Sequence, residues 1–140
     1  MYYFNEGSLE LPEAWRDMTV NVLTSSLDET VGLSFTVSRD TPPWGMGFHE
    51  FFDREIGSLS RQLNHYQLLH QDTGEVNNHP SVTAEFCWSS EQGRIHQLMT
   101  LVDIAPRVLI LTATMVGELT PQQKEHITAI VQTLQINARS

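Results

Sequence analysis

The chain has 140 residues, 40% of them hydrophobic and 18% charged, a balance typical of a folded globular domain rather than of a disordered chain. This length suffices for one sizeable core, so a single domain spanning residues 1–140 is expected. Acidic residues outnumber basic ones 17 to 8, which gives a net charge of −9. Such a surface repels phosphate backbones, and this argues against nucleic acid as a partner.

The first residues lack the pattern of a secretory signal. That signal requires a basic region before an apolar stretch, yet no Lys or Arg precedes Arg16. No apolar run reaches the roughly 18 residues expected of a membrane span. We therefore expect a cytoplasmic protein that does not itself insert into a membrane. Cys87 is the only cysteine, and a buried thiol is its expected state, since no intramolecular disulfide can form.

Hydrophobic alternation predicts strands in the first third of the chain. Short strands are expected at residues 2–4 and 8–11, and a longer one at 18–24. The clearest alternation runs from residue 33 to 38, where apolar and hydroxyl side chains take turns as in a half-buried strand. The apolar spacing then changes to three and four between residues 47 and 64, which predicts an amphipathic helix.

The second half of the chain is predicted to form a meander of strands and a final helix. Strands are expected at 66–70, 82–89, 94–104 and 107–115, with a polar link at 89–93 that makes a hairpin of the second and third. This order predicts an α+β fold, a mainly antiparallel sheet with packed helices. The residues assigned to its core are Phe35, Phe51, Ile56, Trp88 and Ile130.

The start of the final helix is specified by three residues. Thr120 is a suitable N-cap, Pro121 suits the first helical position, and Gln123 completes a Thr-x-x-Gln capping box. The sequence therefore predicts a helix that begins directly after Thr120. Its predicted apolar stripe consists of Ile127, Ile130, Val131 and Leu134.

Motifs for catalysis are missing from the sequence. Asp72-Thr73-Gly74 matches the catalytic tripeptide of dimeric aspartic proteases, but its polar flanks, Gln71 and Glu75, would leave the carboxylate solvated, so a polar turn is expected. The six histidines show no metal-ligand spacing, and neither a nucleophile elbow nor a glycine-rich phosphate loop occurs. We therefore predict that the protein is not an enzyme and needs no metal or cofactor.

Several segments resemble a family of bacterial secretion proteins. The most specific is LELPEAWRDMTVNV at residues 9–22, with its Pro-x-x-Trp-x-Asp pattern before a strand. SFTVSRD at 34–40, the helix at 48–63 and PRVLI at 106–110 continue the similarity. Together they resemble the Eag chaperones of type VI secretion, which are DcrB-related domains with a Mog1/PsbP-like fold.

The resemblance implies a definite role. Eag proteins are cytosolic homodimers that bind the N-terminal transmembrane helices of effectors carrying a PAAR spike domain, including PAAR/Rhs-type effectors. They keep those helices soluble in a hydrophobic groove until the effector is loaded on the VgrG spike. An alternative from another class remains open, a non-enzymatic adaptor that binds another soluble protein through a sheet edge or surface groove.

The resemblance also implies where the bound client segment would lie. In characterised relatives, glutamines that bond the bound helix stand at the positions matching Glu55 and Thr100. We include Leu98 because it shares a strand face with Thr100. From the pattern alone the apolar members of the set could be ordinary core, and Glu55 could reach solvent. The expected groove residues are Val20, Val22, Thr36, Glu55, Leu59, Leu63, Leu98 and Thr100.

Overall fold

The computed structural model describes residues 2–4, 7–9, 20–24 and 33–136. Within these ranges, neither helix is long and apolar enough to cross a membrane. The elements are β1 (Tyr2–Phe4), β2 (Gly7–Leu9), β3 (Asn21–Thr24), β4 (Leu33–Asp40), α1 (Phe48–Gln62), β5 (Gln67–Val76), β6 (His79–Ser90), β7 (Gly93–Ile104), β8 (Arg107–Val116) and α2 (Pro121–Gln132).

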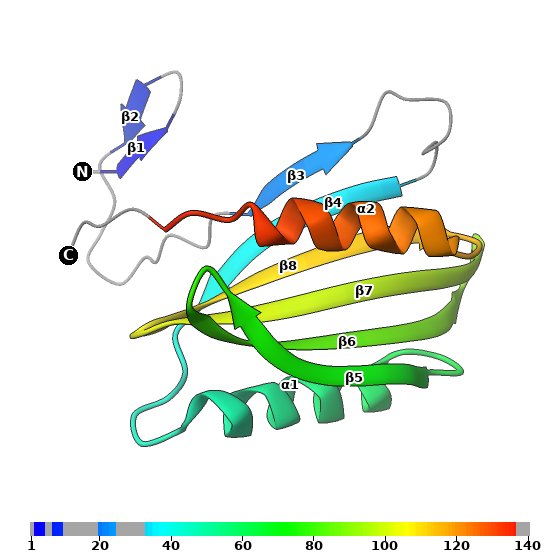
Figure 1. The fold of residues 1–140 in the computed structure, drawn as a ribbon, viewed down its shortest axis with the longest axis horizontal. Coiled ribbons are helices and arrows are strands. Elements are labelled where there is room, and N and C mark those ends of the chain that lie inside the picture. The colour runs from blue at the N-terminus through cyan, green and yellow to red at the C-terminus, as the bar shows by residue number, and fades with distance from the viewer. Residues whose placement is uncertain (1, 5–6, 10–19, 25–32, 137–140) are drawn as a thin grey trace.

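Six of the described strands form one antiparallel sheet in the order β3-β4-β8-β7-β6-β5, and β1 pairs with β2 in a separate hairpin (Figure 1). The predicted α+β architecture is confirmed. Residues 10–11 and 18–19 of two predicted strands lie outside the described part of the chain, as does the motif at 12–17.

Helix α1 covers one face of the sheet, which we call the α1 face. Phe51 and Phe52 are almost completely buried there, against Val82 and Phe86 of β6 and Leu101 of β7. A buried side chain of this size contributes about 1.5–3 kcal/mol through removal of its apolar surface from water. The apolar spacing found in the sequence therefore seats α1 over β6 and β7, away from β3 and β4 (Figure 1).

Helix α2 covers the opposite face, the α2 face, through Ile127 and Val131. The predicted capping box fixes its start: Thr120 Oγ1 accepts the Gln123 backbone N–H at 3.1 Å, and Gln123 Oε1 accepts the Thr120 N–H at 2.9 Å. Ile130, predicted to be core, is 44% exposed, so that assignment was wrong. It was wrong because the helix buries a narrower stripe than its apolar residues suggest.

A buried polar group ties α2 to the sheet. His96 Nδ1 accepts the Leu119 N–H at 2.8 Å, which leaves the proton on Nε2, and that nitrogen lies 2.7 Å from Glu85 Oε2. Lys124 Nζ lies 3.3 Å from the same oxygen. Burial raises the pKa of the Glu85 carboxyl, but hydrogen bonds from His96 and Lys124 outweigh this and leave the pKa below its usual value. Glu85 is therefore a charged anchor for α2.

Strand β5 is longer than predicted. Asp72 pairs with Thr83 and Gly74 with Ser81, so the predicted turn at 72–74 was wrong. The chain turns instead at Asn77-Asn78, where both residues have positive φ, as a tight hairpin requires. Nearly every β5 side chain is exposed, so the strand carries no apolar alternation that could have revealed its length.

Cys87 is buried, as predicted, and its burial raises the pKa of the thiol.

Candidate functional site

The pairing of the strands assigns two of the predicted site residues to the α1 face. Thr36 of β4 lies opposite Thr112 of β8, which lies opposite Met99 of β7, a member of the core beneath α1. Val22 of β3 lies opposite Thr36. Because directly paired residues project to the same side of a sheet, Val22 and Thr36 share the α1 face.

Helix α1 brings three more predicted residues to this side. Leu59 and Leu63 are half-buried and pack against the core beneath α1. Glu55 lies one turn before Leu59, and its side chain is 33% exposed, 3.4 Å from the Arg54 guanidinium. Such an ion pair near the surface contributes little to stability, so Glu55 stays available to a polar group.

The two valines project from the chain instead of being sealed inside it. Val20 is 51% exposed and Val22 is 65% exposed. The β3 end of the α1 face is therefore apolar and open among the described residues.

Leu98 and Thr100 do not join the other six residues. Leu98 belongs to the core beneath α2, and Thr100 is 6% exposed with its hydroxyl 3.2 Å from that of Thr83. Both project to the α2 face, so the structure does not form one groove lined by all eight predicted residues. A shift of one residue along a strand exchanges its faces, and the residues of β7 on the α1 face include Gln97, Met99 and Leu101.

Gln97 is a polar residue of this face that the sequence reasoning missed. Its Oε1 accepts the Trp88 Nε1–H at 2.7 Å, and its Nε2 donates to Thr114 Oγ1 at 2.9 Å. The signal was the link between β6 and β7, where Ser90 pairs with Gly93 across a two-residue turn. Counting forward along β7 from that turn pairs its residues with partners in β6, whereas the predicted link at 89–93 left the register open.

A strip of small hydroxyl side chains occupies the α1 face of β4 and β8, and all its members are half-buried. Among the described residues the hydroxyls of Thr36 and Thr112 have no hydrogen-bond partner. Small hydroxyl residues let a helix backbone approach closely and can donate to its carbonyls. We call this set the hydroxyl strip: Ser34, Thr36, Ser38, Thr112 and Thr114.

Comparisons with known proteins agree with this architecture. The chain belongs to the DcrB family, whose sequence pattern matches residues 6–133. It is 24% identical over 135 residues to the Pseudomonas aeruginosa protein named effector EagT6, and the match covers 96% of this chain and 94% of that protein. The family resemblance drawn from the sequence is thereby confirmed.

Two solved structures share the fold. PA94 from Pseudomonas aeruginosa, described as a protein of unknown function, superposes with a TM-score of 0.78 at 25% identity, over 99% of this chain and 96% of that one. The PsbP protein CyanoP of Synechocystis sp. PCC 6803 reaches a TM-score of 0.51 at 7% identity, over 81% of this chain and 77% of that one. The likeness to CyanoP concerns the fold alone and confirms the predicted PsbP-like architecture.

Proposed function

We propose that this chain is a cytoplasmic type VI secretion chaperone, acting as one DcrB-related domain over residues 1–140. It binds the N-terminal transmembrane helices of a PAAR/Rhs-type effector and shields them until the effector is loaded on the VgrG spike. Similarity to EagT6 supports this class of function, and no catalytic step is part of it. The observation that carries the proposal is the exposure of Val20 and Val22 beside the hydroxyl strip.

The apolar part of the surface matches the main need of such a client. A transmembrane helix carries about 20 apolar residues, and each Leu, Ile or Phe that is covered gains roughly 1.5–3 kcal/mol. Val20 and Val22 offer apolar contacts on one side of the strip, and Leu59 and Leu63 offer them on the α1 side. A client helix lying between these borders would contact both.

The hydroxyl strip matches a second need, which is solubility of the chaperone without its client. A strip of leucines would bind a helix equally well but would also promote self-association. Threonine presents a methyl group to the client and a hydroxyl to water when the site is empty. Thr36 and Thr112 can thus serve both states of the protein.

The dimensions of the client support a homodimer. A helix of 20 residues is about 30 Å long and 10 Å wide. Strand β4, with eight residues, extends roughly 27 Å and can follow most of that length, but one sheet face covers only one side of a helix. A second copy facing the first would enclose the remaining sides, so we propose that two chains hold one client region.

Adjacent residues of β3 provide a matched test. Val22 faces the α1 side, while Leu23 is 58% exposed on the opposite side, paired with Phe35. Co-expression with an effector bearing transmembrane helices should yield a soluble complex with the wild type and with Leu23→Asp, but not with Val22→Asp. Equal retention of the effector by both variants, with both folded, would contradict the assignment of the client to the α1 face.

A second candidate is an adaptor that binds a soluble protein by strand addition. Strand β5 supports it, because it ends the described sheet order and exposes Leu68 at 41% and Leu69 at 44%. This role predicts a partner without transmembrane helices, and binding that survives Val22→Asp but is lost in Leu69→Lys.

A further inference from the structure

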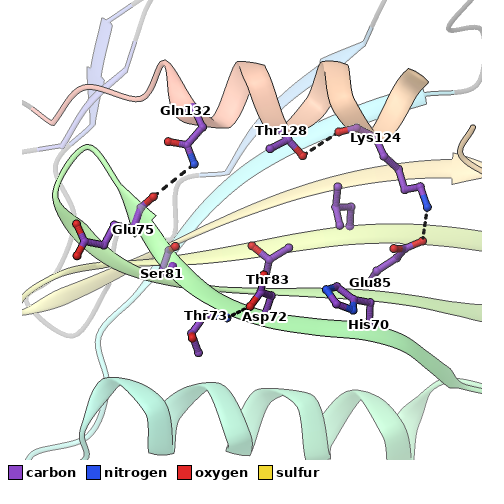
Figure 2. Close-up of a pocket in the computed structure, with 12 residues that line it drawn as sticks. His70, Asp72, Thr73, Glu75, Ser81, Thr83, Glu85, Lys124, Thr128 and Gln132 are labelled. Atoms are coloured by element: carbon purple, nitrogen blue, oxygen red, sulfur yellow. Dashed lines mark hydrogen bonds and ion pairs between the residues drawn. The ribbon is translucent and has the colours of Figure 1, made fainter. Parts of the chain in front are cut away.

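A cavity of about 320 Å³ lies on the α2 face, between β5 and α2 (Figure 2). Its floor includes Ser81 and Thr83 of β6, one wall carries Asp72 and Gly74 of β5, and the other carries Gln132 of α2. A smaller recess of about 50 Å³ continues from it beneath α2 and shares Ser81, Thr83 and Gln132. The cavity is on the other side of the sheet from the hydroxyl strip and is independent of the proposed function.

Ser81 is the unusual polar group of this cavity. The residue is 6% exposed, it lines both the cavity and the recess, and its hydroxyl has no hydrogen-bond partner within the described ranges. Three neighbouring polar groups are paired: Thr83 with Thr100, Thr128 with the Lys124 carbonyl, and the Gln132 amide nitrogen with the Glu75 carbonyl at 3.4 Å. Within the described ranges only the Tyr66 hydroxyl is sealed from solvent without a partner, so the Ser81 oxygen is open to the cavity and can bond a ligand there.

Gly74 holds the cavity open. It lies directly opposite Ser81 in the β5–β6 pairing, on the same face. A Cβ at position 74 would meet Ser81 Oγ at 3.8 Å, which is an ordinary contact. Nothing in the backbone therefore demands glycine here, and a larger side chain would simply occupy the space above Ser81.

The charge of the lining favours a cation. Lys124 contributes a positive charge, but its Nζ is already engaged with Glu85. Asp72 has no ion-pair partner among the described residues, and its Oδ1 accepts only the N–H of Thr73 at 2.9 Å. The cavity is thus lined by the Asp72 carboxylate from β5, which has no ion-pair partner among the described residues, and by the Ser81 hydroxyl from β6 (Figure 2).

We propose that this cavity binds a primary ammonium group, carried either by a lysine side chain of a protein partner or by a free alkylamine. An ammonium has three N–H donors and no acceptor, which suits a lining that offers the Asp72 carboxylate and the Ser81 hydroxyl oxygen. Leu98 on the floor provides apolar contact for a short alkyl stem. A volume of this size matches a small ligand or one long side chain.

The test is an NMR titration of the full chain labelled with ¹⁵N, using n-butylammonium and N-acetyl-lysine methylamide as probes and n-butanol as the uncharged control. Both ammonium probes should shift the amide resonances of Gly74 and Ser81 saturably, and n-butanol should not. If the lysine derivative binds at least tenfold more tightly, the natural source is a lysine side chain. Equal affinities would indicate a free amine.

Variants separate a specific site from general attraction to an acidic protein. Asp72→Asn should weaken binding about tenfold or more, as expected for the loss of one charge-assisted hydrogen bond. Asp53→Asn removes a charge from exposed α1 and should leave affinity unchanged. Gly74→Val should abolish binding while circular dichroism stays native, and Ser81→Ala provides a second cavity variant. The proposal is overturned if neither ammonium probe shifts these resonances. It is also overturned if Asp72→Asn and Asp53→Asn bind the probes with the same affinity.

Discussion

Strand β4 presents two contrasting surfaces. On the α2 face Leu33, Phe35 and Val37 pack against the core. On the α1 face the same strand carries Ser34 and Thr36, which no described side chain bonds. A permanently solvated face usually carries charged residues. Small hydroxyls suit a face that meets water in one state and an apolar partner in the other, as proposed above, and the following variants test that contrast.

The largest effect on stability is expected beneath α1, where the α1 face is covered by the helix. Phe51 is 0% exposed beneath α1, so Phe51→Ala should lower the free energy of unfolding by about 3–5 kcal/mol. Urea denaturation measures this loss. A loss below about 1 kcal/mol would show that α1 is loosely attached. The part of the α1 face beneath the helix would then be no better packed than the hydroxyl strip.

The anchor of α2 should give the next largest effect. Glu85→Ala removes the acceptor shared by His96 and Lys124, and about 1.5–3 kcal/mol of stability should be lost at neutral pH. Because the pKa of Glu85 is lowered in the folded state, its contribution is present above the pKa of the unfolded carboxyl. The contribution disappears as the pH falls through the folded pKa.

Unfolding curves of the wild type and Glu85→Ala should therefore converge in acid. A difference in stability that stays constant from neutral pH down to about pH 3 would be inconsistent with a charged Glu85.

The capping box of α2 should contribute less to the stability of the α2 face than the Glu85 anchor does. Thr120→Ala removes the side-chain acceptor for the Gln123 N–H and should cost about 1 kcal/mol. Thermal unfolding followed by circular dichroism measures it. Thr120→Ser, which keeps the oxygen, is the control and should stay close to the wild type.

The smallest change in stability belongs to the hydroxyl strip. Thr36→Val keeps the shape of the side chain but removes its hydroxyl, so stability should change by less than about 0.5 kcal/mol. Dissociation of the client should become about fivefold faster, as the loss of one hydrogen bond worth about 1 kcal/mol implies. Surface plasmon resonance measures that rate. An unchanged rate would mean that the strip does not bond the client.

The sequence predicts much of the fold because its signals are local. The alternation in β4 and the capping box at Thr120 each depend on a few neighbouring residues, and both are confirmed. The extent of β5 could not be predicted, since an exposed edge strand has no apolar period.

The candidate site depends on a longer-range property, the register of β7. That strand has apolar residues on both faces, such as Met99 on one and Leu98 on the other, so hydrophobicity alone cannot tell which face a residue takes. Thr100 was assigned from the family resemblance and Leu98 from the strand face that it shares with Thr100, and pairing with β8 directs both to the α2 face. Only the pairing of whole strands shows that Leu98 and Thr100 lie on the α2 face and Gln97 on the α1 face.

Thiol protection tests most directly whether the client lies on the hydroxyl strip. Cys87 is 4% exposed and should therefore react slowly, so a new surface cysteine can be followed in its presence. Thr36→Cys should react readily with a maleimide in the free protein and at least tenfold more slowly in the complex with client. Leu23→Cys should react at the same rate in both. Unchanged reactivity of Thr36→Cys on client binding would contradict the account.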